Sequence, residues 1–324
     1  MSPGGLMWQF IKWHKIIGNW IAIRLFDRPL PPPTARETEL GAALHRELTA
    51  PSAPSVLPKW TTFREEVRRN FDAYDPRTFL RWPLIQHTMC VTNSGALVRE
   101  FFALRTSPEW PRFRRAVEES PAGQPIPFIY HPRSSGNLLH HAYHILRFGE
   151  VTGADVAGLD LVVEFGGGYG SMCRLLHRLG FKGRYVIYDL PEFSALQRYF
   201  LKNLDLPVHN RTDGPMENGI HLLSDFEQFR QVLAATPRRG PAALIGTWSL
   251  SESPLELRDR FLALVADFDY FLIAFQNRFF ETDNNEYFAG FERATAGRIV
   301  WWKKRLHHLP GNNYLFGKIG KAHV

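Results

Sequence analysis

The chain has 324 residues, of which 44% are hydrophobic and 22% are charged. These fractions are close to the averages of globular proteins, so wholesale disorder and collagen-like or coiled-coil architectures are excluded. The formal net charge is +7, but the basic residues are scattered along the chain rather than gathered in one block. We therefore predict no nucleic-acid partner, whereas an anionic small ligand or a lipid surface suits this charge equally well. The two cysteines, Cys90 and Cys173, lie far apart in sequence, so neither a disulfide framework nor a cysteine-built zinc site is expected.

An amphipathic helix is predicted over residues 7–26, and a proline-rich linker follows it to residue 33. One face of this helix carries the apolar side chains of Phe10, Trp13, Ile16, Ile17, Trp20, Ile21 and Ile23. Lys12 and Lys15 interrupt the apolar run and no small-residue cleavage site follows it, so neither a membrane-spanning helix nor a secretory signal is expected. We expect a cytoplasmic protein. Two interpretations stay open: the helix lies on a membrane surface or a partner, or it packs on its own domain or across a homodimer.

Residues 34–150 are predicted to form a helical subdomain that is broken by prolines. Residues 151–324 instead alternate short apolar runs with helical stretches, which is the pattern of parallel strands joined by crossover helices. Such strands are expected at residues 159–165, 183–189, 219–223, 242–248 and 269–275. Two further strands, at residues 298–302 and 313–318, are expected to form a terminal antiparallel hairpin.

A glycine-rich loop with the sequence Glu-Phe-Gly-Gly-Gly-Tyr-Gly follows the first predicted strand, at residues 164–170. Glycines at alternate positions let the backbone turn sharply and approach a ligand closely. The carboxyl end of the first strand in such a sheet is a nucleotide-binding position. A dinucleotide fingerprint would have a further glycine where Ser171 stands, so the spacing weakens an NAD interpretation. We predict cofactor contacts at Gly166, Gly167, Gly168 and Gly170.

Two acidic residues indicate which cofactor this loop binds. Asp189 ends the second strand about twenty residues beyond the loop, where a carboxylate can accept hydrogen bonds from both ribose hydroxyls. Glu164 ends the first strand, so close to the loop that it would repel a pyrophosphate but would attract a sulfonium and an α-amino group. The charges therefore favour S-adenosylmethionine over a dinucleotide.

These residues carry a resemblance to the class I methyltransferases, and most closely to the sugar O-methyltransferase family that accompanies polysaccharide-assembly genes. The motifs that match are E-x-G-G-G-x-G at residues 164–170, D-L-P at Asp189 to Pro191, S-L-S-E at Ser249 to Glu252, and Asn277. Ser253 departs from the family pattern, which has methionine at that position. The resemblance covers roughly residues 130–320 and implies a Rossmann-like, seven-stranded, doubly wound α/β sheet that binds S-adenosylmethionine.

Several further residues at expected strand ends are candidates for cofactor or acceptor contacts. The fold implied by the resemblance places Leu190, Ser224, Asp225 and Thr247 near the cofactor, while Asp225 is equally well placed as the N-cap of the next helix. Trp248, Ser249 and Asn277 are assigned to acceptor binding, and the alternative for Trp248 is a place in the core. Glu252 is a candidate acceptor-side base, whereas Ser251 is expected to cap the helix that follows.

Three histidines on one predicted helix complete the candidates. His140 and His144 share a helix face at a spacing of four residues, and His141 lies next to them. No glutamate intervenes as in a zinc-binding H-E-x-x-H motif, so no metal site is predicted. One of these histidines is expected to touch the acceptor or act as its base, with satisfied helix histidines as the alternative.

We therefore predict an S-adenosylmethionine-dependent O-methyltransferase of a sugar hydroxyl, for a glycan or a glycosylated metabolite. Two alternatives stay open. The first is a methyltransferase of the same fold that acts on a phenolic or polyketide hydroxyl. The second is a noncatalytic subunit of a glycan assembly complex that has kept this fold.

Overall fold

The computed structural model describes residues 16–27, 29–50, 58–210 and 213–320. The chain divides into two compact units. The first unit holds Met1–His144, Gly168–Leu179 and Pro191–Pro207, and the second holds Ile145–Gly167, Gly180–Leu190 and Val208–Val324. Two segments that lie between strands in the sequence thus belong to the first unit. The sequence-based boundary near residue 150 stays a prediction.

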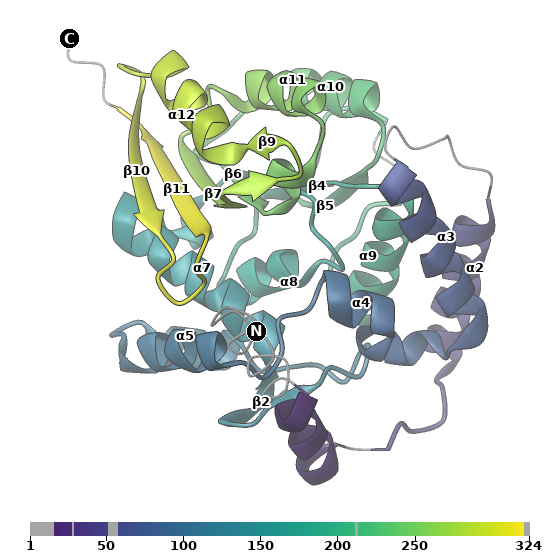
Figure 1. Ribbon diagram of the computed structural model, residues 1–324. Helices are drawn as coiled ribbons and strands as arrows, with labels where there is room; N and C mark the ends of the chain where they lie inside the picture. The colour runs from purple at the N-terminus through teal and green to yellow at the C-terminus, as the bar shows by residue number, and fades with distance from the viewer. Residues whose placement is uncertain (1–15, 28, 51–57, 211–212, 321–324) are drawn as a thin grey trace. The chain divides into compact units, whose positions relative to one another are not determined.

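The first unit is built mainly of helices (Figure 1), as the sequence predicts for its N-terminal part. Prolines begin several of them because the first helical residue needs no backbone N–H donor. The elements are a helix over residues 16–26, α2 (Ala35–Thr49), α3 (Pro58–Ala73), η1 (Pro76–Arg81), α4 (Pro83–Thr88), α5 (Gly95–Thr106), α6 (Trp110–Ala116), the first half of α7 (Gly136–Thr152), α8 (Ser171–Arg178) and α9 (Pro191–Asn203). A short antiparallel pair, β1 (Pro127–Phe128) and β2 (His131–Ser135), was not expected because this proline-containing segment has no alternating apolar pattern.

The N-terminal helix packs on its own unit through small residues. Gly18 lies so close to Asn93 that an added Cβ would be 2.8 Å from the Asn93 Cβ, and Ala22 is fully buried. Asn93 Nδ2 also donates to Asn19 Oδ1 at 3.1 Å. Ile16, Ile17 and Trp20 of the predicted apolar face are exposed, whereas Ile21 and Ile23 are half-buried, so most of the packing falls outside that face. Phe10 and Trp13 of that face lie outside the described residues.

The second unit contains a seven-stranded sheet in the order β10-β11-β7-β6-β3-β4-β5, so the predicted Rossmann-like α/β fold is confirmed. Its strands are β3 (Leu161–Phe165), β4 (Arg184–Tyr188), β5 (Gly219–Leu223), β6 (Ala242–Thr247), β7 (Tyr270–Gln276), β10 (Ile299–Arg305) and β11 (Asn312–Ile319). Strands β3 to β7 are parallel, whereas β11 pairs antiparallel with both β7 and β10. The predicted terminal hairpin is therefore also confirmed.

Alternating side chains give this sheet two buried faces within the second unit. One face packs against α10 (Phe226–Ala235), α11 (Leu255–Val265) and α12 (Asn284–Ala294), which lie together on one side of the strands in Figure 1. On the other face, Phe148 of α7 contacts Tyr270 and Phe316 with ring centroids 6.2 and 6.4 Å away. Helices thus cover both faces, which explains why the central strands are continuous apolar runs.

The sheet has a topological switch point between β3 and β6. From β3 the chain moves outward to β4 and β5, and it then returns to add β6 and β7 on the opposite side of β3. In open α/β sheets, ligands bind outside the carboxyl ends of the strands at such a point. This is where the sequence places Glu164, the glycine-rich loop and Thr247.

Among the described residues, no helix has the length and apolar character needed to cross a membrane.

Candidate functional site

The glycine-rich loop begins at the switch point with a backbone that only glycine tolerates easily. Gly166 has a φ of +74°, and a Cβ at this position would lie 2.2 Å from the Cβ of Ser249. The Ser249 hydroxyl donates to the Gly166 carbonyl at 3.2 Å, so the ends of β3 and β6 are joined directly. The structure thus gives Ser249, which was assigned to acceptor binding, a place against the loop.

Glu164 is a buried carboxyl group at the end of β3, with 2% of the residue exposed. The Tyr185 hydroxyl donates to its Oε2 at 2.9 Å. Gly167 lies against the same oxygen, since a Cβ there would come within 3.0 Å of it. Burial, with a smaller contribution from the charge of Asp189, raises the pKa of Glu164 to about 8 against the lowering effect of the tyrosine. A cation placed here would reverse that shift.

The other predicted cofactor residues follow the ends of β4, β5 and β6. Asp189 comes directly after β4 and its Oδ1 accepts from the Leu190 amide at 2.8 Å, while its own amide donates to the Leu223 carbonyl. Asp189 and Leu190 are both half-buried. Thr247 and Ser224 are also half-buried at their strand ends. These strand ends lie at one edge of the sheet, as predicted.

Asp225 caps a helix. It is the N-cap of α10 and its Oδ1 accepts from the Gln228 amide at 2.7 Å. The side chain is exposed. The capping interpretation therefore has direct structural support, and the cofactor contact stays a prediction.

Trp248, directly after β6, has an unusual backbone conformation, with φ 63° and ψ −47°. Its amide donates to the Ala274 carbonyl at 2.7 Å, and its indole Nε1 donates to Asn312 Oδ1 at 2.7 Å. The residue is half-buried, so it is not a fully enclosed core side chain. Strained conformations of this kind cost of order 1–3 kcal/mol and gather at functional sites.

The segment from Ser249 to Glu252 forms the short helix η3. The prediction that Ser251 caps the next helix is wrong, because α11 begins at Leu255 with Pro254 as its N-cap. The Ser251 hydroxyl instead bonds to the Trp248 carbonyl at 2.7 Å and to Gln276 Oε1 at 2.9 Å. The Gln276 amide in turn donates to Glu252 at 3.2 Å. Gln276, which the sequence did not single out, therefore orients the candidate base.

Asn277 follows β7 and belongs to a cluster of polar side chains. Its Oδ1 accepts from Asn313 Nδ2 at 2.7 Å, and the Asn285 Oδ1 accepts from Lys303 Nζ at 3.0 Å and lies 3.4 Å from Asn313 Nδ2. Asn313 is nearly buried at 6% exposure. The predicted acceptor residue Asn277 is thus fixed by the terminal hairpin through Asn313.

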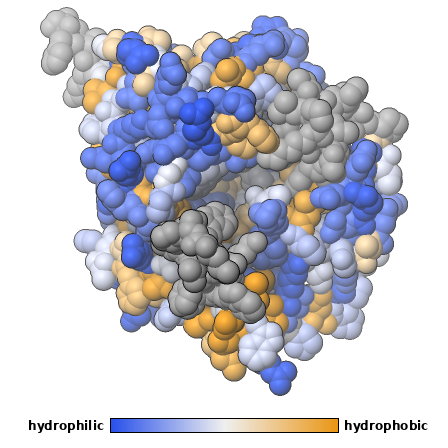
Figure 2. Space-filling model, viewed as in Figure 1, coloured by the Kyte–Doolittle hydropathy of each residue, from blue (hydrophilic) through white to orange (hydrophobic). Residues whose placement is uncertain are grey.

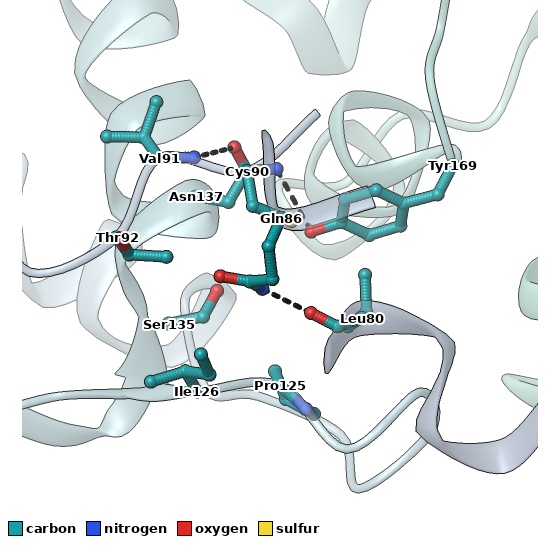
Figure 3. A pocket seen from close by; sticks show the side chains of 10 residues that line it. All are labelled: Leu80, Gln86, Cys90, Val91, Thr92, Pro125, Ile126, Ser135, Asn137 and Tyr169. Carbon is teal, nitrogen blue, oxygen red and sulfur yellow. Dashed lines mark hydrogen bonds between the residues drawn. The ribbon is translucent and has the colours of Figure 1, made fainter. Parts of the chain in front are cut away.

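The second half of the loop belongs to the first unit. Gly168 and Gly170 have positive φ values of +56° and +94°. Between them, Tyr169 is buried and its hydroxyl accepts from Asn137 Nδ2 at 3.0 Å. Figure 3 shows these two side chains beside a cavity, with Asn137 also accepting from the Val91 amide. The cavity measures about 10 Å³, enough for roughly one water molecule, so it does not accommodate an acceptor.

The three predicted histidines cluster in the first unit, around a glutamate that the sequence analysis missed. His140 Nδ1 lies 2.7 Å from Glu100 Oε2, and both side chains are buried. His144 is fully buried, and its ring centroid lies 4.1 Å from that of His140 in an edge-to-face arrangement. Glu100 occupies a position of the apolar stripe of α5 that otherwise holds Leu97, Phe101 and Leu104. An acidic residue within the apolar stripe of a helix is the sequence signal that could have identified Glu100 as a buried partner.

His141 differs from its neighbours. Its Nδ1 is buried without a hydrogen-bond partner among the described residues. Burial, together with the adjacent His140, lowers the pKa of His141 to about 3. A base works best when its pKa lies near the working pH, so His141 is a weak candidate base. Within the described residues, no group of three or more His, Cys, Asp or Glu side chains is arranged to hold a metal ion.

The predicted site residues thus divide between the two units. The carboxyl edge of the sheet, in the second unit, brings together the ends of β3, β4, β5, β6 and β7. The histidines and the second half of the loop belong to the first unit.

The chain matches no protein-family model and no curated protein. Among solved structures, it is similar to methyltransferases at low identity. The mitomycin 7-O-methyltransferase MmcR is 13% identical with a TM-score of 0.36, over 88% of this chain and 95% of that one. Magnesium protoporphyrin IX methyltransferase from Synechocystis PCC 6803, with bound SAH, is 12% identical with a TM-score of 0.35, over 70% and 99%. The 23S rRNA methyltransferase ErmE is 17% identical with a TM-score of 0.34, over 55% and 67%.

Proposed function

We propose that this protein is an S-adenosylmethionine-dependent methyltransferase that methylates a hydroxyl group of a sugar. The observation that carries the proposal is the buried carboxyl group of Glu164 at the switch point of the sheet. Once it is ionised, a carboxyl group beside a glycine-rich loop would repel a pyrophosphate, so it disfavours a dinucleotide. It would stabilise a ligand that carries a sulfonium and an α-amino group.

Several residues support the same cofactor. Gly166 and Gly167 let the loop pack tightly at the end of β3, since a Cβ at either position would meet Ser249 or Ile187. Without side chains at these positions, the backbone would also be able to approach the ligand closely. Asp189, which follows β4, would accept hydrogen bonds from the ribose hydroxyls. Leu190, Ser224, Thr247 and Asp225 would supply contacts to the remainder of the nucleoside.

The acceptor side of the proposal rests on two groups of residues. Trp248 is half-buried, and its ring would offer a surface on which an apolar sugar face can stack, in an orientation that Asn312 fixes. Asn277 and Glu252 add hydrogen-bonding groups at the ends of neighbouring strands. In the first unit, Glu100 holds the His140 ring through Nδ1, which directs its other ring nitrogen away from the glutamate.

In this reaction the protein has two tasks: it positions the acceptor oxygen and it accepts the acceptor's proton. S-adenosylmethionine supplies an activated methyl group when it is bound. The protein must hold the acceptor oxygen in line with that methyl group, which lowers the barrier through proximity and orientation. An alcohol has a high pKa, so a base must also accept its proton, and His140, His144 or Glu252 would serve. Glu252 comes first because it belongs to the same unit as Glu164 and Asp189, and Gln276 orients it.

Calorimetric titration of the purified protein with S-adenosylhomocysteine, with NADH as the control ligand, tests the cofactor. We expect micromolar binding of S-adenosylhomocysteine alone, and at least about tenfold weaker binding in Glu164→Ala and Asp189→Ala, because each loses a charge-assisted hydrogen bond. The matched control is Glu227→Ala, which removes an exposed carboxylate on α10. Binding of NADH, or unchanged affinity in both site variants, would contradict the proposal.

Transfer of labelled methyl groups tests the acceptor. We expect incorporation into sugars or nucleotide-linked sugars in preference to phenols. Glu252→Ala should lower kcat by about a hundredfold or more, while S-adenosylhomocysteine affinity changes little, because the base acts on the acceptor. Incorporation into phenols only would keep the methyltransferase and overturn the sugar assignment.

A further inference from the structure

The N-terminal helix presents an apolar face that its own unit leaves uncovered. Among its described residues, Ile16 is 59% exposed, Ile17 is 49% exposed and Trp20 is 64% exposed. In Figure 2 hydrophobic surface gathers at the bottom of the view, over the position where Figure 1 draws this helix. Apolar side chains gathered in this way indicate a binding surface rather than isolated exposed residues.

This face is held outward by specific contacts on the opposite side of the helix. Gly18 and Ala22, four residues apart, lie against the body of the first unit. Ile16, Trp20 and Arg24, also four residues apart, lie on the far side. At the end of the helix, Asp27 Oδ2 accepts from Arg81 Nη1 at 2.8 Å, which fixes its position.

The charge of the segment indicates what covers this face. Residues 1–26 contain Lys12, Lys15 and Arg24 but no aspartate or glutamate. The first acidic residue, Asp27, is paired with Arg81. The segment is therefore purely cationic, and Arg24 stands within the exposed apolar face itself. A second copy of the same face would bring like charges together, which is unfavourable when they lose their water.

We propose that this helix binds the surface of an anionic lipid bilayer, lying in the plane of the interface. Tryptophan and long basic side chains are the residues that prefer the boundary between acyl chains and headgroups. Arg24 would extend its guanidinium to the lipid phosphates while its methylene groups lie along the apolar layer. The described part of this helix, residues 16–26, is shorter than the roughly 20 residues that a bilayer-spanning helix needs, which favours a position in the interface.

Vesicle co-sedimentation of the full-length protein tests this inference. The probes are vesicles of phosphatidylcholine alone and of phosphatidylcholine mixed with phosphatidylglycerol. We expect binding to the mixed vesicles that weakens as salt is added, since the basic residues attract anionic lipid electrostatically. The variant Ile16→Ser/Ile17→Ser/Trp20→Ser should bind at least about tenfold more weakly, because three interfacial apolar side chains are lost.

A matched control replaces exposed apolar residues elsewhere, as Phe102→Ser/Leu255→Ser/Val300→Ser, and should bind like the wild type. The single change Arg24→Glu should also weaken binding to the mixed vesicles, by about tenfold, without touching the packed face of the helix. Thermal unfolding followed by circular dichroism confirms that each variant is folded.

Three outcomes would overturn the inference. The first is no binding of the wild type to the mixed vesicles. The second is an equal loss of binding in the control variant. The third, seen by sedimentation velocity without lipid, is a wild-type dimer that becomes monomeric in the Ile16/Ile17/Trp20 variant, which would make a second copy the occupant of this face.

Discussion

Glu164 is a carboxyl group that the fold buries at the end of β3. Its hydrogen bond from Tyr185 stabilises the ionised form, but burial outweighs that effect and raises the pKa to about 8. In the free protein the group is therefore mostly protonated at neutral pH. A cationic ligand would have to displace that proton, so ligand binding and proton release are coupled.

This coupling predicts how the affinity for S-adenosylmethionine depends on pH. We expect the affinity to rise with pH up to about pH 8, by as much as roughly tenfold per unit, because less of the binding energy is used to ionise Glu164. Calorimetry in buffers of different ionisation enthalpy should detect the released proton. The variant Glu164→Gln should bind more weakly and without this pH dependence. A wild-type affinity that stays flat between pH 6 and pH 9 would contradict the assignment.

Gly166 is the second residue that decides the local geometry. Its φ of +74°, and the 2.2 Å that would separate an added Cβ from the Cβ of Ser249, make alanine unfavourable twice over. We expect Gly166→Ala to lower the free energy of unfolding by on the order of 2–4 kcal/mol, from backbone strain and overpacking together. Urea denaturation measures the loss.

The double variant Gly166→Ala/Ser249→Gly separates these two causes. The double variant should regain the part of the free energy of unfolding that the clash with Ser249 removes. The part lost to the positive φ should remain lost. If the second change recovers nothing, Ser249 is not the neighbour that requires glycine at this position.

At the scale of whole elements, the site is assembled from the ends of strands and the beginnings of helices. The end of β5 leads through Asp225 into α10, and the end of β6 leads through Trp248 into η3. A polar residue at such a junction can serve the helix or a ligand. Asp225 serves the helix, since its carboxylate accepts from the Gln228 amide.

Two substitutions at Asp225 measure the capping role. Asp225→Ala should lower the free energy of unfolding by about 1 kcal/mol. Asp225→Asn should lower it much less, because asparagine is also a good N-cap. Urea denaturation provides the comparison. If Asp225 also contacts the cofactor through its charge, Asp225→Asn will weaken S-adenosylhomocysteine binding without a loss of stability. Equal destabilisation by both variants would contradict the capping role.

At the scale of the whole molecule, the buried acid affects stability as well as binding. The pKa of Glu164 is about 8 in the folded protein and near 4.5 when the chain is unfolded. The native state therefore holds a proton that the unfolded state releases between these values. The bound proton on Glu164 therefore stabilises the folded state fully below about pH 4.5, and this stabilisation is lost as the pH rises towards 8.

We accordingly expect Glu164→Gln, which has no charge to bury, to become more stable relative to the wild type as the pH rises from about 5 to 8. Thermal or urea unfolding of both proteins without ligand, across this range, measures the difference. The matched control Glu227→Gln, at an exposed position, should show no such trend. A difference between Glu164→Gln and the wild type that does not grow with pH would contradict the buried state of this carboxyl group.

Local sequence patterns predict the strands of the sheet and the residues at their carboxyl ends. Apolar runs bounded by turns predicted β3 to β7 to within about two residues, because strands that are buried on both faces leave an unmistakable local pattern. The glycines of the loop were also readable, since a positive φ strongly favours glycine. Glu164 and Asp189 could be singled out because each lies at the end of such a strand.

The hydrogen-bond and packing partners of these residues depend on the tertiary structure. The pairing of Glu100 with His140 joins side chains forty positions apart, and that of Trp248 with Asn312 joins residues still farther apart. Ser251 was expected to cap a helix but bonds to Gln276 instead, since α11 begins later than its local signals indicate. The N-terminal helix packs through Gly18 and Ala22, although its apolar pattern indicated the opposite face. Local sequence fixes periodicity and backbone preference, whereas the choice of contact depends on which distant surfaces fold against each other.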